Sequence, residues 1–457
     1  MSEKKNVDTL HLEAATNPGL MREIFQRYLP PLGEKTYEVL DCQISFARHR
    51  GLDRRKLHYT LRLVELGTKR ERSLLLTGTT YPEGRTKRIW EKLRRSELGR
   101  GLPGTSSSFE SFFYIPDLDM LVQVFPYDHR LPALRFLMEE RSPELEGALL
   151  AVFGPGDWRT EAWDAKPVRY RVGMRATLQL TVQARDAATD RVEVRCFYAK
   201  VYRHEHEGEQ AYQVLRELQD KASTGGNGFA VGKPVAYLSG LRTLVQEEVP
   251  GVSLLDILLR RGEEEAIPAV RRAASAVASL HLLDLAPSRR RRLRDEVVGL
   301  EDAGKLLRSV HPHLSQRIEE ILSAVMTGLE EVAPAPTHGD LAPRHIFLAG
   351  DCTALVDFDK FAGSDPILDV ADLLFLLAKA RPHATHLQER QWALARAFTE
   401  EYFIHVPVDW KSRLTFHYAS VLLRKAAGSF QHRDPGSSDE VENLLEEAEN
   451  SLRGKIW

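Results

Sequence analysis

Two aspartates, Asp340 and Asp357, lie seventeen residues apart in a stretch whose pattern brings them together. Between them, two short apolar runs at 346–348 and 354–356 flank turn residues at 349–351. This pattern predicts a β-hairpin, and a hairpin brings its two ends side by side. We therefore expect the two carboxylates to meet. One could accept the proton of an attacking hydroxyl, and the other could hold a metal ion that bridges phosphate groups.

An alternative interpretation of this stretch is a buried hairpin with acids on its surface. The tripeptide HGD at 338–340 does not by itself separate the two interpretations. The segment continues, however, with VDFD at 356–359 and with DPILD at 365–369. This ordered set of motifs favours the functional interpretation.

The three motifs resemble those of the aminoglycoside phosphotransferase and choline kinase family of small-molecule kinases. The family pattern is HGD followed by LxxxN, then a strand ending in ID or VD, then GDPxxDLA. The resemblance implies that Asp340 is the catalytic base, that His338 braces its loop and that Asp357 binds metal. It also implies that Asp369 is a buried acid that supports the catalytic loop. Ser364 stands where the family usually has glycine.

Position 345 departs from the family pattern, because the metal-binding asparagine is replaced by His345. Magnesium prefers oxygen ligands, whereas imidazole suits manganese or zinc better. Three outcomes are open. His345 binds the metal in a different way, it has left the site so that Asp357 acts alone, or catalysis is lost. The cofactors implied by the resemblance are ATP and Mg²⁺, and His345 predicts an unusual tolerance for Mn²⁺.

The resemblance also implies a phosphate-binding lysine upstream of these motifs. Lys200 lies on a predicted strand, VRCFYAKVYR, and lysine suits this role as a compact charged donor. The helix predicted at 207–218 should supply an acid that orients it. Glu209 is the first candidate and Glu217 the second. A lone lysine on a strand is otherwise a solvated side chain.

Two further nucleotide contacts follow from the same resemblance. The turn at 171–175 would cover the phosphates through Gly173, although one glycine is not a strong phosphate-binding signature. Backbone groups near Glu248 and Val249, at the end of a predicted strand, would hydrogen-bond adenine.

The elements before residue 250 occur twice in the same order, at an offset of 121 to 125 residues. For example, residues 57–59 match 178–180, and residues 76–80 match 198–202. We interpret this as an internal duplication; a chance likeness of two α+β domains is the alternative. Gly78 replaces the lysine in the first copy, so that copy is predicted not to bind ATP. A cap, a dimer surface or a substrate gate are the roles we expect for it.

The fold predicted is α+β: a bilobal protein kinase-like fold preceded by an N-terminal domain that resembles a duplicated N-lobe. The expected boundaries are 1–150 for the repeat without catalytic residues, 151–250 for the N-lobe and 251–457 for the helical C-lobe. A helical stretch is predicted at 306–332, ended by Pro334 and Pro336.

Composition excludes several other classes. The formal net charge is −2, so bulk electrostatics favour neither nucleic acid nor a membrane surface. The short basic run RRRRLR at 289–294 is expected to be a solvated helix start or loop. Three widely spaced cysteines fit a reducing cytoplasm. The longest apolar segment contains Asp372 and Lys379 and cannot span a bilayer.

The predicted function is ATP-dependent transfer of the γ-phosphoryl group to a hydroxyl of a small molecule. A sugar, an amino alcohol or an aminoglycoside-like compound is the expected acceptor, and a homodimer is a possible assembly. One alternative is a pseudokinase that acts as a nucleotide-binding or regulatory module. Another is a protein kinase, but no convincing activation segment follows Asp357.

Overall fold

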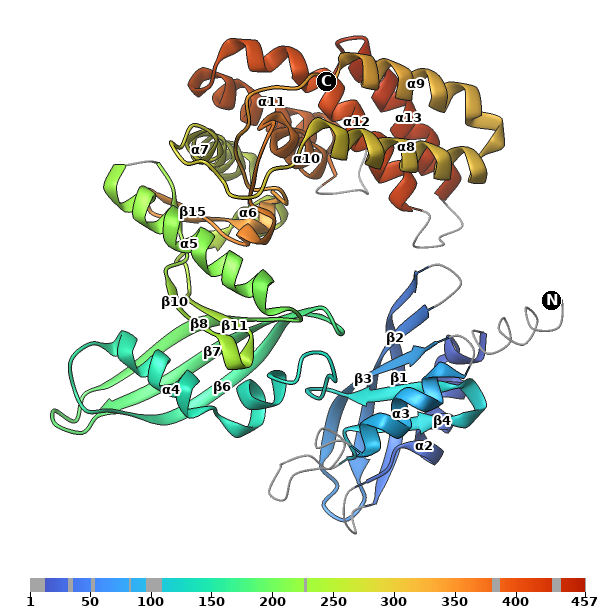
Figure 1. The fold of residues 1–457 in the computed structure, drawn as a ribbon, viewed down its shortest axis with the longest axis vertical. Helices are drawn as coiled ribbons and strands as arrows, with labels where there is room; N and C mark the ends of the chain where they lie inside the picture. The colour runs from blue at the N-terminus through green and yellow to red at the C-terminus, as the bar shows by residue number, and fades with distance from the viewer. Residues whose placement is uncertain are drawn as a thin grey trace. The chain divides into compact units, whose positions relative to one another are not determined.

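The structure is a computed structural model that describes residues 13–31, 36–50, 54–81, 84–95, 109–225, 228–379, 387–429 and 437–456 (Figure 1). The chain forms two compact units. One comprises Met1–Glu209 and Val235–Gln246, and the other comprises Gln210–Pro234 and Glu247–Trp457. The first is rich in β-strands and the second is mostly helical. The predicted α+β composition is therefore confirmed, while the three-part division at 150 and 250 stays a prediction.

The first sheet of the β-rich unit has the strand order β1-β2-β3-β5-β4. A preceding helix, α2 (Pro18–Tyr28), begins at the N-cap Asn17, whose side chain accepts a hydrogen bond from the Leu20 N–H. The strands are β1 (Tyr37–Arg50), β2 (Arg54–Glu65), β3 (Glu71–Thr80), β4 (Phe112–Ile115) and β5 (Met120–Val124).

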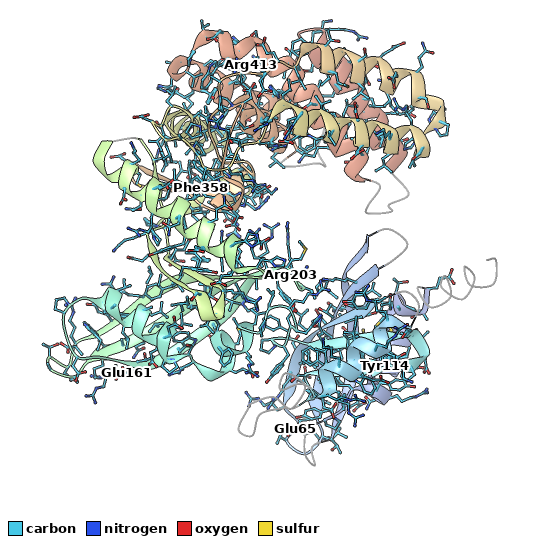
Figure 2. The ribbon with its side chains drawn as sticks, in the orientation of Figure 1. Glu65, Tyr114, Glu161, Arg203, Phe358 and Arg413 are labelled. Atoms are coloured by element: carbon cyan, nitrogen blue, oxygen red, sulfur yellow. The ribbon has the colours of Figure 1, made fainter. Side chains whose placement is uncertain are left out.

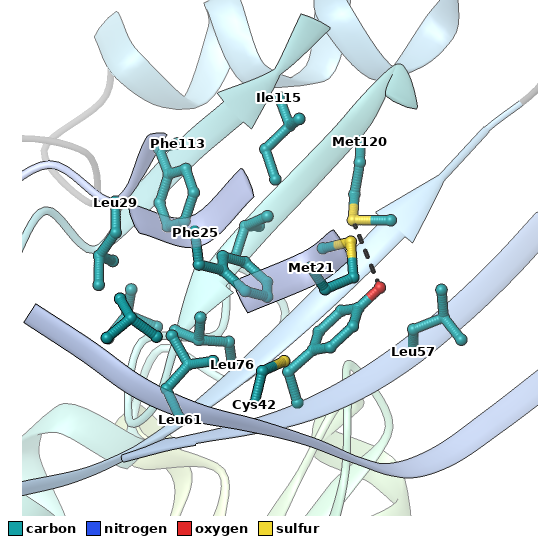
Figure 3. Packing of buried hydrophobic residues seen from close by; sticks show 14 of the residues in the cluster. Met21, Phe25, Leu29, Cys42, Leu57, Leu61, Leu76, Phe113, Ile115 and Met120 are labelled. Carbon is teal, nitrogen blue, oxygen red and sulfur yellow. Dashed lines mark hydrogen bonds between the residues drawn. The ribbon is translucent and has the colours of Figure 1, made fainter. Parts of the chain in front are cut away.

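Helix α2 buries Met21 and Phe25 against this sheet (Figure 3). Alternate residues of β2 face the helix, because successive side chains of a strand point to opposite faces. Among them is Tyr59, whose ring lies 5.0 Å from that of Phe25 and whose hydroxyl donates to the Ala15 carbonyl. Helix α3 (Arg85–Arg95) contributes Leu93 to a separate cluster with Phe112, Leu121 and Tyr127.

The second sheet has the order β10-β11-β8-β7-β6. Its core contains alternate residues of β7 and β8, which pack against α4 (Pro143–Leu150) and the segment that leads into it. The strands are β6 (Trp158–Arg171), β7 (Arg175–Asp186), β8 (Val192–Tyr202), β10 (Pro234–Leu238) and β11 (Thr243–Glu247).

Both sheets have the same topology, which is what an internal duplication would produce. Their ladders agree at an offset of 121 residues: Leu57 pairs with Gly78 in the first sheet, and Leu178 pairs with Ala199 in the second. This register corrects the alignment made from sequence. Thr79, not Gly78, occupies the position of Lys200.

The faces of the strands agree with this correction. Gly78 faces the first core, since a Cβ atom there would lie 2.4 Å from the Met120 sulfur. Ala199 faces the second core in the same way, so Lys200 points to the opposite face of its sheet.

The helical unit contains the Asp340–Asp357 stretch and two small sheets. One sheet has the order β12-β14-β15-β9, and the other pairs β13 with β16. The strands are β9 (Ala230–Val231), β12 (Val252–Ser253), β13 (Ala335–Thr337), β14 (Ile346–Ala349), β15 (Cys352–Leu355) and β16 (Ala362–Ser364). The helices are α6 (Leu254–Arg260), α7 (Glu263–His281), α8 (Leu293–Val310), α9 (Ser315–Gly328), α10 (Ile367–Ala378), α11 (Leu387–His405), α12 (Leu414–Ser429) and α13 (Ser437–Leu452).

The helical stretch predicted at 306–332 is made of two helices and ends at Gly328, before the two prolines. Helix α8 ends at Val310, and α9 begins at Ser315 after the 3₁₀ turn Pro312–Leu314. Proline at position 312 cannot donate an intrahelical hydrogen bond and clashes with the preceding turn, which explains the break. In the part of the chain that the structure describes, no helix has the length and apolar character needed to cross a membrane.

The basic run leads into α8 and includes its first two residues, as expected for a helix start. Arg291 pairs with the buried carboxylate of Glu296, which Arg424 of α12 also contacts at 2.6 Å. Arg291 therefore shares the Glu296 carboxylate with Arg424, and the Glu296–Arg424 pair joins α8 to α12.

Candidate active site

The hairpin predicted between the two aspartates is confirmed. β14 and β15 are antiparallel: Ile346 lies opposite Leu355 at one end, and Ala349 lies opposite Cys352 at the other. Gly350 is in the turn, with a φ of 49°. At the open end of the hairpin, ligand atoms of Asp340, His345 and Asp357 all lie within 4.8 Å of one another. The prediction that the two carboxylates meet is therefore correct in geometry.

The loop that carries Asp340 is held by hydrogen bonds from both sides. The His338 ring is fully buried, and its Nε2 donates to the Val356 carbonyl at 2.8 Å. It therefore ties the loop to the residue before Asp357. Phe358, labelled in Figure 2, contacts the His338 ring with centroids 4.8 Å apart. Gly339 has a φ of 75°, and a Cβ atom there would lie 2.4 Å from the Lys360 carbonyl oxygen. Glycine fits this turn because it tolerates both constraints.

Asp369, at the start of α10, braces the same loop. Its carboxylate accepts the backbone N–H groups of His338 at 2.5 Å and Gly339 at 2.9 Å. His281 of α7 lies 3.2 Å from the same carboxylate, and its other nitrogen contacts the Tyr402 hydroxyl at 2.8 Å. Burial acts to raise the pKa of Asp369, but its hydrogen bond to His281 contributes to a net lowering. The loop is thus fixed from the helical core.

His345 is buried and lies between the two aspartates. Its Nδ1 lies 2.9 Å from the Asp340 backbone carbonyl, and its Nε2 lies 3.5 Å from an Asp357 carboxylate oxygen. A carbonyl can only accept, so this contact assigns the ring proton to Nδ1. Burial, assisted by the nearby His338, lowers the pKa of His345 to about 4. The ring is therefore neutral at pH 7 and directs a lone pair toward Asp357.

His345 Nε2 and the Asp357 carboxylate, 3.5 Å apart, both offer lone pairs and could ligate one cation together with Asp340. Asp357 also has a φ of 72°, a left-handed conformation that is uncommon for residues other than glycine. Backbone strain of this kind often accompanies a functional site. The donor set of one imidazole and two carboxylates fits Mn²⁺ or Zn²⁺ readily, and Mg²⁺ through its oxygens.

Lys360 is a residue of this site that the motifs did not indicate. The 3₁₀ turn Phe358–Lys360 brings its Nζ to 2.6 Å from the Asp340 carboxylate. Burial acts to raise the pKa of Asp340, but the Lys360 hydrogen bond and charge lower it overall. Asp340 is thus ionised at neutral pH, as a proton acceptor must be. In the sequence, Lys360 could have been found only through its position three residues after Asp357.

The predicted nucleotide-binding residues of the β-rich unit are placed as follows. Lys200 is 7% exposed and lies on the face of β8 away from the second core. Gly173 lies in the tight turn between β6 and β7 at a φ of 62°. Glu209 is exposed on α5 (Glu205–Gly225). The pKa of Tyr237 in β10 is raised by burial and by the negative charges of Glu205 and Glu209. The charge of Glu209 therefore interacts with a tyrosine of β10.

The remaining predicted residues belong to the helical unit. Glu217 is exposed in the middle of α5. β11 ends at Glu247, so Glu248 and Val249 lie in the segment that follows it and not in the strand itself. Their roles, and that of an acid partner for Lys200, stay predictions.

Residues 179–404 match the family model of the phosphotransferase enzyme family. The match begins in β7, includes Lys200 and the whole Asp340–Asp369 segment, and ends in α11. The resemblance drawn from the motifs is thereby confirmed. The chain resembles no protein of curated function closely enough to match.

Among solved structures, the chain is similar to the aminoglycoside phosphotransferase APH(2'')-Ib bound to ADP, at 13% identity and a TM-score of 0.41. That alignment covers 68% of this chain and 99% of the other. It is also similar to a choline/ethanolamine kinase family protein from Mesorhizobium loti, at 13% identity and a TM-score of 0.42. This alignment covers 69% of this chain and 96% of the other. A third is an amicoumacin kinase in complex with AMP-PNP and Ca²⁺, at 14% identity and a TM-score of 0.41, covering 62% and 88%.

Proposed function

We propose that the protein is an ATP-dependent phosphotransferase that moves the γ-phosphoryl group to a hydroxyl of a small molecule in the cytoplasm. The observation that carries this proposal is the convergence of Asp340, His345 and Asp357 at one end of a hairpin. The family match over 179–404 supports it. A sugar, an amino alcohol or an aminoglycoside-like compound is the proposed acceptor class.

In this proposal Asp340 accepts the proton of the acceptor hydroxyl. The lowered pKa of Asp340 means that the carboxylate is ionised at neutral pH, and its side chain is partly exposed. His338 and Asp369 keep the loop in place. Lys360 provides a positive charge beside the proton acceptor, which would stabilise negative charge that develops on the transferred group.

Asp357 and His345 would hold the metal, and Lys200 would hold the nucleotide phosphates. When bound, the divalent ion neutralises phosphate charge and orients the γ-phosphoryl group for in-line transfer. Because His345 offers a nitrogen ligand, we expect Mn²⁺ to support the reaction at least as well as Mg²⁺. The variant His345→Asn should shift the preference toward Mg²⁺ in an ADP-release assay. An unchanged ratio of the two activities would show that His345 does not bind the metal.

A pseudokinase is the second candidate, and one observation favours it. Lys360 already pairs with Asp340, and a permanent ion pair would occupy the group that must accept the proton. The pair is exposed, with the Lys360 side chain 56% accessible, so solvent screens it and its free energy is small. An incoming acceptor could therefore displace the lysine.

The test is ADP release from ATP with Mg²⁺ or Mn²⁺, in the presence of panels of sugars, amino alcohols and aminoglycosides. We expect at least one acceptor to stimulate release. Asp340→Asn should reduce that release by roughly 10²- to 10⁴-fold, the usual contribution of a general base, and retain nucleotide binding. Full activity of Asp340→Asn would exclude the base assignment. Nucleotide binding with no acceptor-dependent release would favour the pseudokinase.

A further inference from the structure

The turn between β6 and β7 is held by a buried carboxylate from outside the second sheet. The Gly173 N–H donates to Asp128 at 2.6 Å, and the Tyr170 hydroxyl donates to the same oxygen at 3.0 Å. The other oxygen of Asp128 accepts the Arg130 N–H at 2.8 Å. Asp128 is only 1% exposed. Such a group is retained at a cost in desolvation that these three hydrogen bonds must offset.

Asp128 lies in the segment that connects the first sheet to the second. β5 of the first sheet ends at Val124, and Leu131 and Leu134 already belong to the second core. The side chain of Arg130 packs on the same turn, since a Cβ atom on Gly173 would lie 2.9 Å from its Cδ. The connection between the sheets therefore contacts the turn through two neighbouring side chains.

The first sheet contacts this turn as well. The ammonium group of Lys56, from β2, donates to the Val172 carbonyl. The His58 ring, also from β2, makes an edge contact with Tyr170 at 6.3 Å between centroids. The backbone donor of Gly173 and the carbonyl of Val172 are thus both engaged by residues that precede the second sheet.

We propose that Asp128 is a positioning residue that fixes the Arg171–Met174 turn for nucleotide phosphates, so that the N-terminal region sets the affinity for ATP. This inference rests on the proposed function and on the family resemblance, which implies that the turn covers the phosphates. The geometry favours a role for Asp128 in holding the turn, and not one in blocking the nucleotide site. Asp128 belongs to the segment that packs on the core face of the sheet, whereas Lys200 points to the opposite face.

The test compares binding of ATP with Mn²⁺ and binding of adenosine, by calorimetry, in the full-length protein. We expect Asp128→Ala to weaken ATP binding by about tenfold or more and to leave adenosine binding unchanged, since adenosine has no phosphates for the turn to contact. Asp128→Asn, which keeps an acceptor oxygen, should restore part of the affinity. Tyr170→Phe, which removes one hydrogen bond and keeps the ring, should weaken ATP binding several-fold.

The matched control is Asp117→Ala, because Asp117 also accepts a tyrosine hydroxyl, that of Tyr28 at 3.0 Å, but this bond joins helix α2 to the turn between β4 and β5, away from the Arg171–Met174 turn. It should bind ATP like the parent. Parental ATP affinity in Asp128→Ala and Tyr170→Phe, or an equal loss for ATP and adenosine, would overturn the positioning role. Absence of ATP binding in the parent itself would instead overturn the proposed function, and this inference with it.

Discussion

Two acidic sites of the helical unit, at Asp340 and at Asp365, lie 25 residues apart in the sequence but in contrasting surroundings. Asp365 is 9% exposed in its side chain, and Arg413, labelled in Figure 2, donates to both of its oxygens. His417 and the Ile367 N–H complete its shell. Asp340 is 32% exposed in its side chain and pairs with one exposed lysine. Asp357, its neighbour, has a strained backbone.

These different surroundings distinguish carboxylates that stabilise the fold from carboxylates that are available for a ligand. A buried acid with a full set of donors from two elements is a structural residue, because removing it leaves the donors unpaired. An acid with few donors, partial exposure and a second acceptor nearby can bind a cation or accept a proton. The motif DPILD places both structural acids, Asp365 and Asp369, directly after the candidate site.

Replacing the structural acid should have the largest effect on stability. Asp365→Ala leaves Arg413 and His417 buried without their shared partner, so we expect the free energy of unfolding to fall by about 3–5 kcal/mol. Urea denaturation at pH 7 measures it, with Asp351→Ala in the exposed hairpin turn as the control. A loss below about 1 kcal/mol would show that solvent already reaches this cluster.

Replacing the candidate metal ligand should affect binding and not stability. Asp357→Ala should weaken metal-dependent ATP binding by on the order of a hundredfold, with an unfolding free energy close to the parent's. Calorimetric titration of ATP with Mg²⁺, Mn²⁺ or a chelator measures it. If Asp357→Ala unfolds as readily as Asp365→Ala, the contrast between the two sites does not hold.

The contribution of Asp365 to the free energy of unfolding should be lost at low pH. Although burial acts to raise it, its hydrogen bonds from His417 and Arg413 hold the pKa of Asp365 at about 2, against 3.8 for an ordinary aspartate. The stabilisation is fully present above the unfolded value and is lost as the pH falls through 2. It amounts to roughly 2 kcal/mol, about half of which should be gone by pH 3.

The measurement for this prediction is the difference in unfolding free energy between the parent and Asp365→Asn at pH 6 and at pH 3. Taking the difference cancels the titration of other acids. A difference that stays constant between these two pH values would contradict the lowered pKa.

The smallest effect on stability is expected at Lys360. Lys360→Ala should change the unfolding free energy by less than about 1 kcal/mol, because the ion pair is exposed. The pKa of Asp340 should rise without the ammonium group, so the acidic limb of the pH profile of kcat/KM should move to higher pH. An unmoved limb would show that Lys360 has no influence on the proton acceptor.

Sequence alone predicted the parts of the molecule that depend on local pattern. The hairpin at 346–355 followed from two apolar runs and a glycine turn, and a hairpin fixes where its ends lie. The buried role of Asp369 followed from the family resemblance. The shared strand order of the two sheets was visible as a repeat.

What sequence did not predict depends on contacts between distant residues or on a shift of one position. Asp128 contacts Gly173 across 45 residues, and no local pattern marks such a pair. The match of Lys200 to Thr79 needed the strand register, since a slip of one residue moves a side chain to the other face. Pro312 marks the break between α8 and α9 in the sequence. The break was not predicted, because the residues on both sides of it have a helical pattern.

Thermal unfolding with and without ATP, in Mg²⁺ and then in Mn²⁺, tests the central proposal most directly, because it requires no knowledge of the acceptor. At about a hundredfold excess over its dissociation constant, bound nucleotide should add roughly 2.7 kcal/mol of stability. We expect a metal-dependent rise in Tm in the parent and none in Asp357→Ala. No shift in either metal at millimolar ATP would contradict a nucleotide site built on Asp357 and His345.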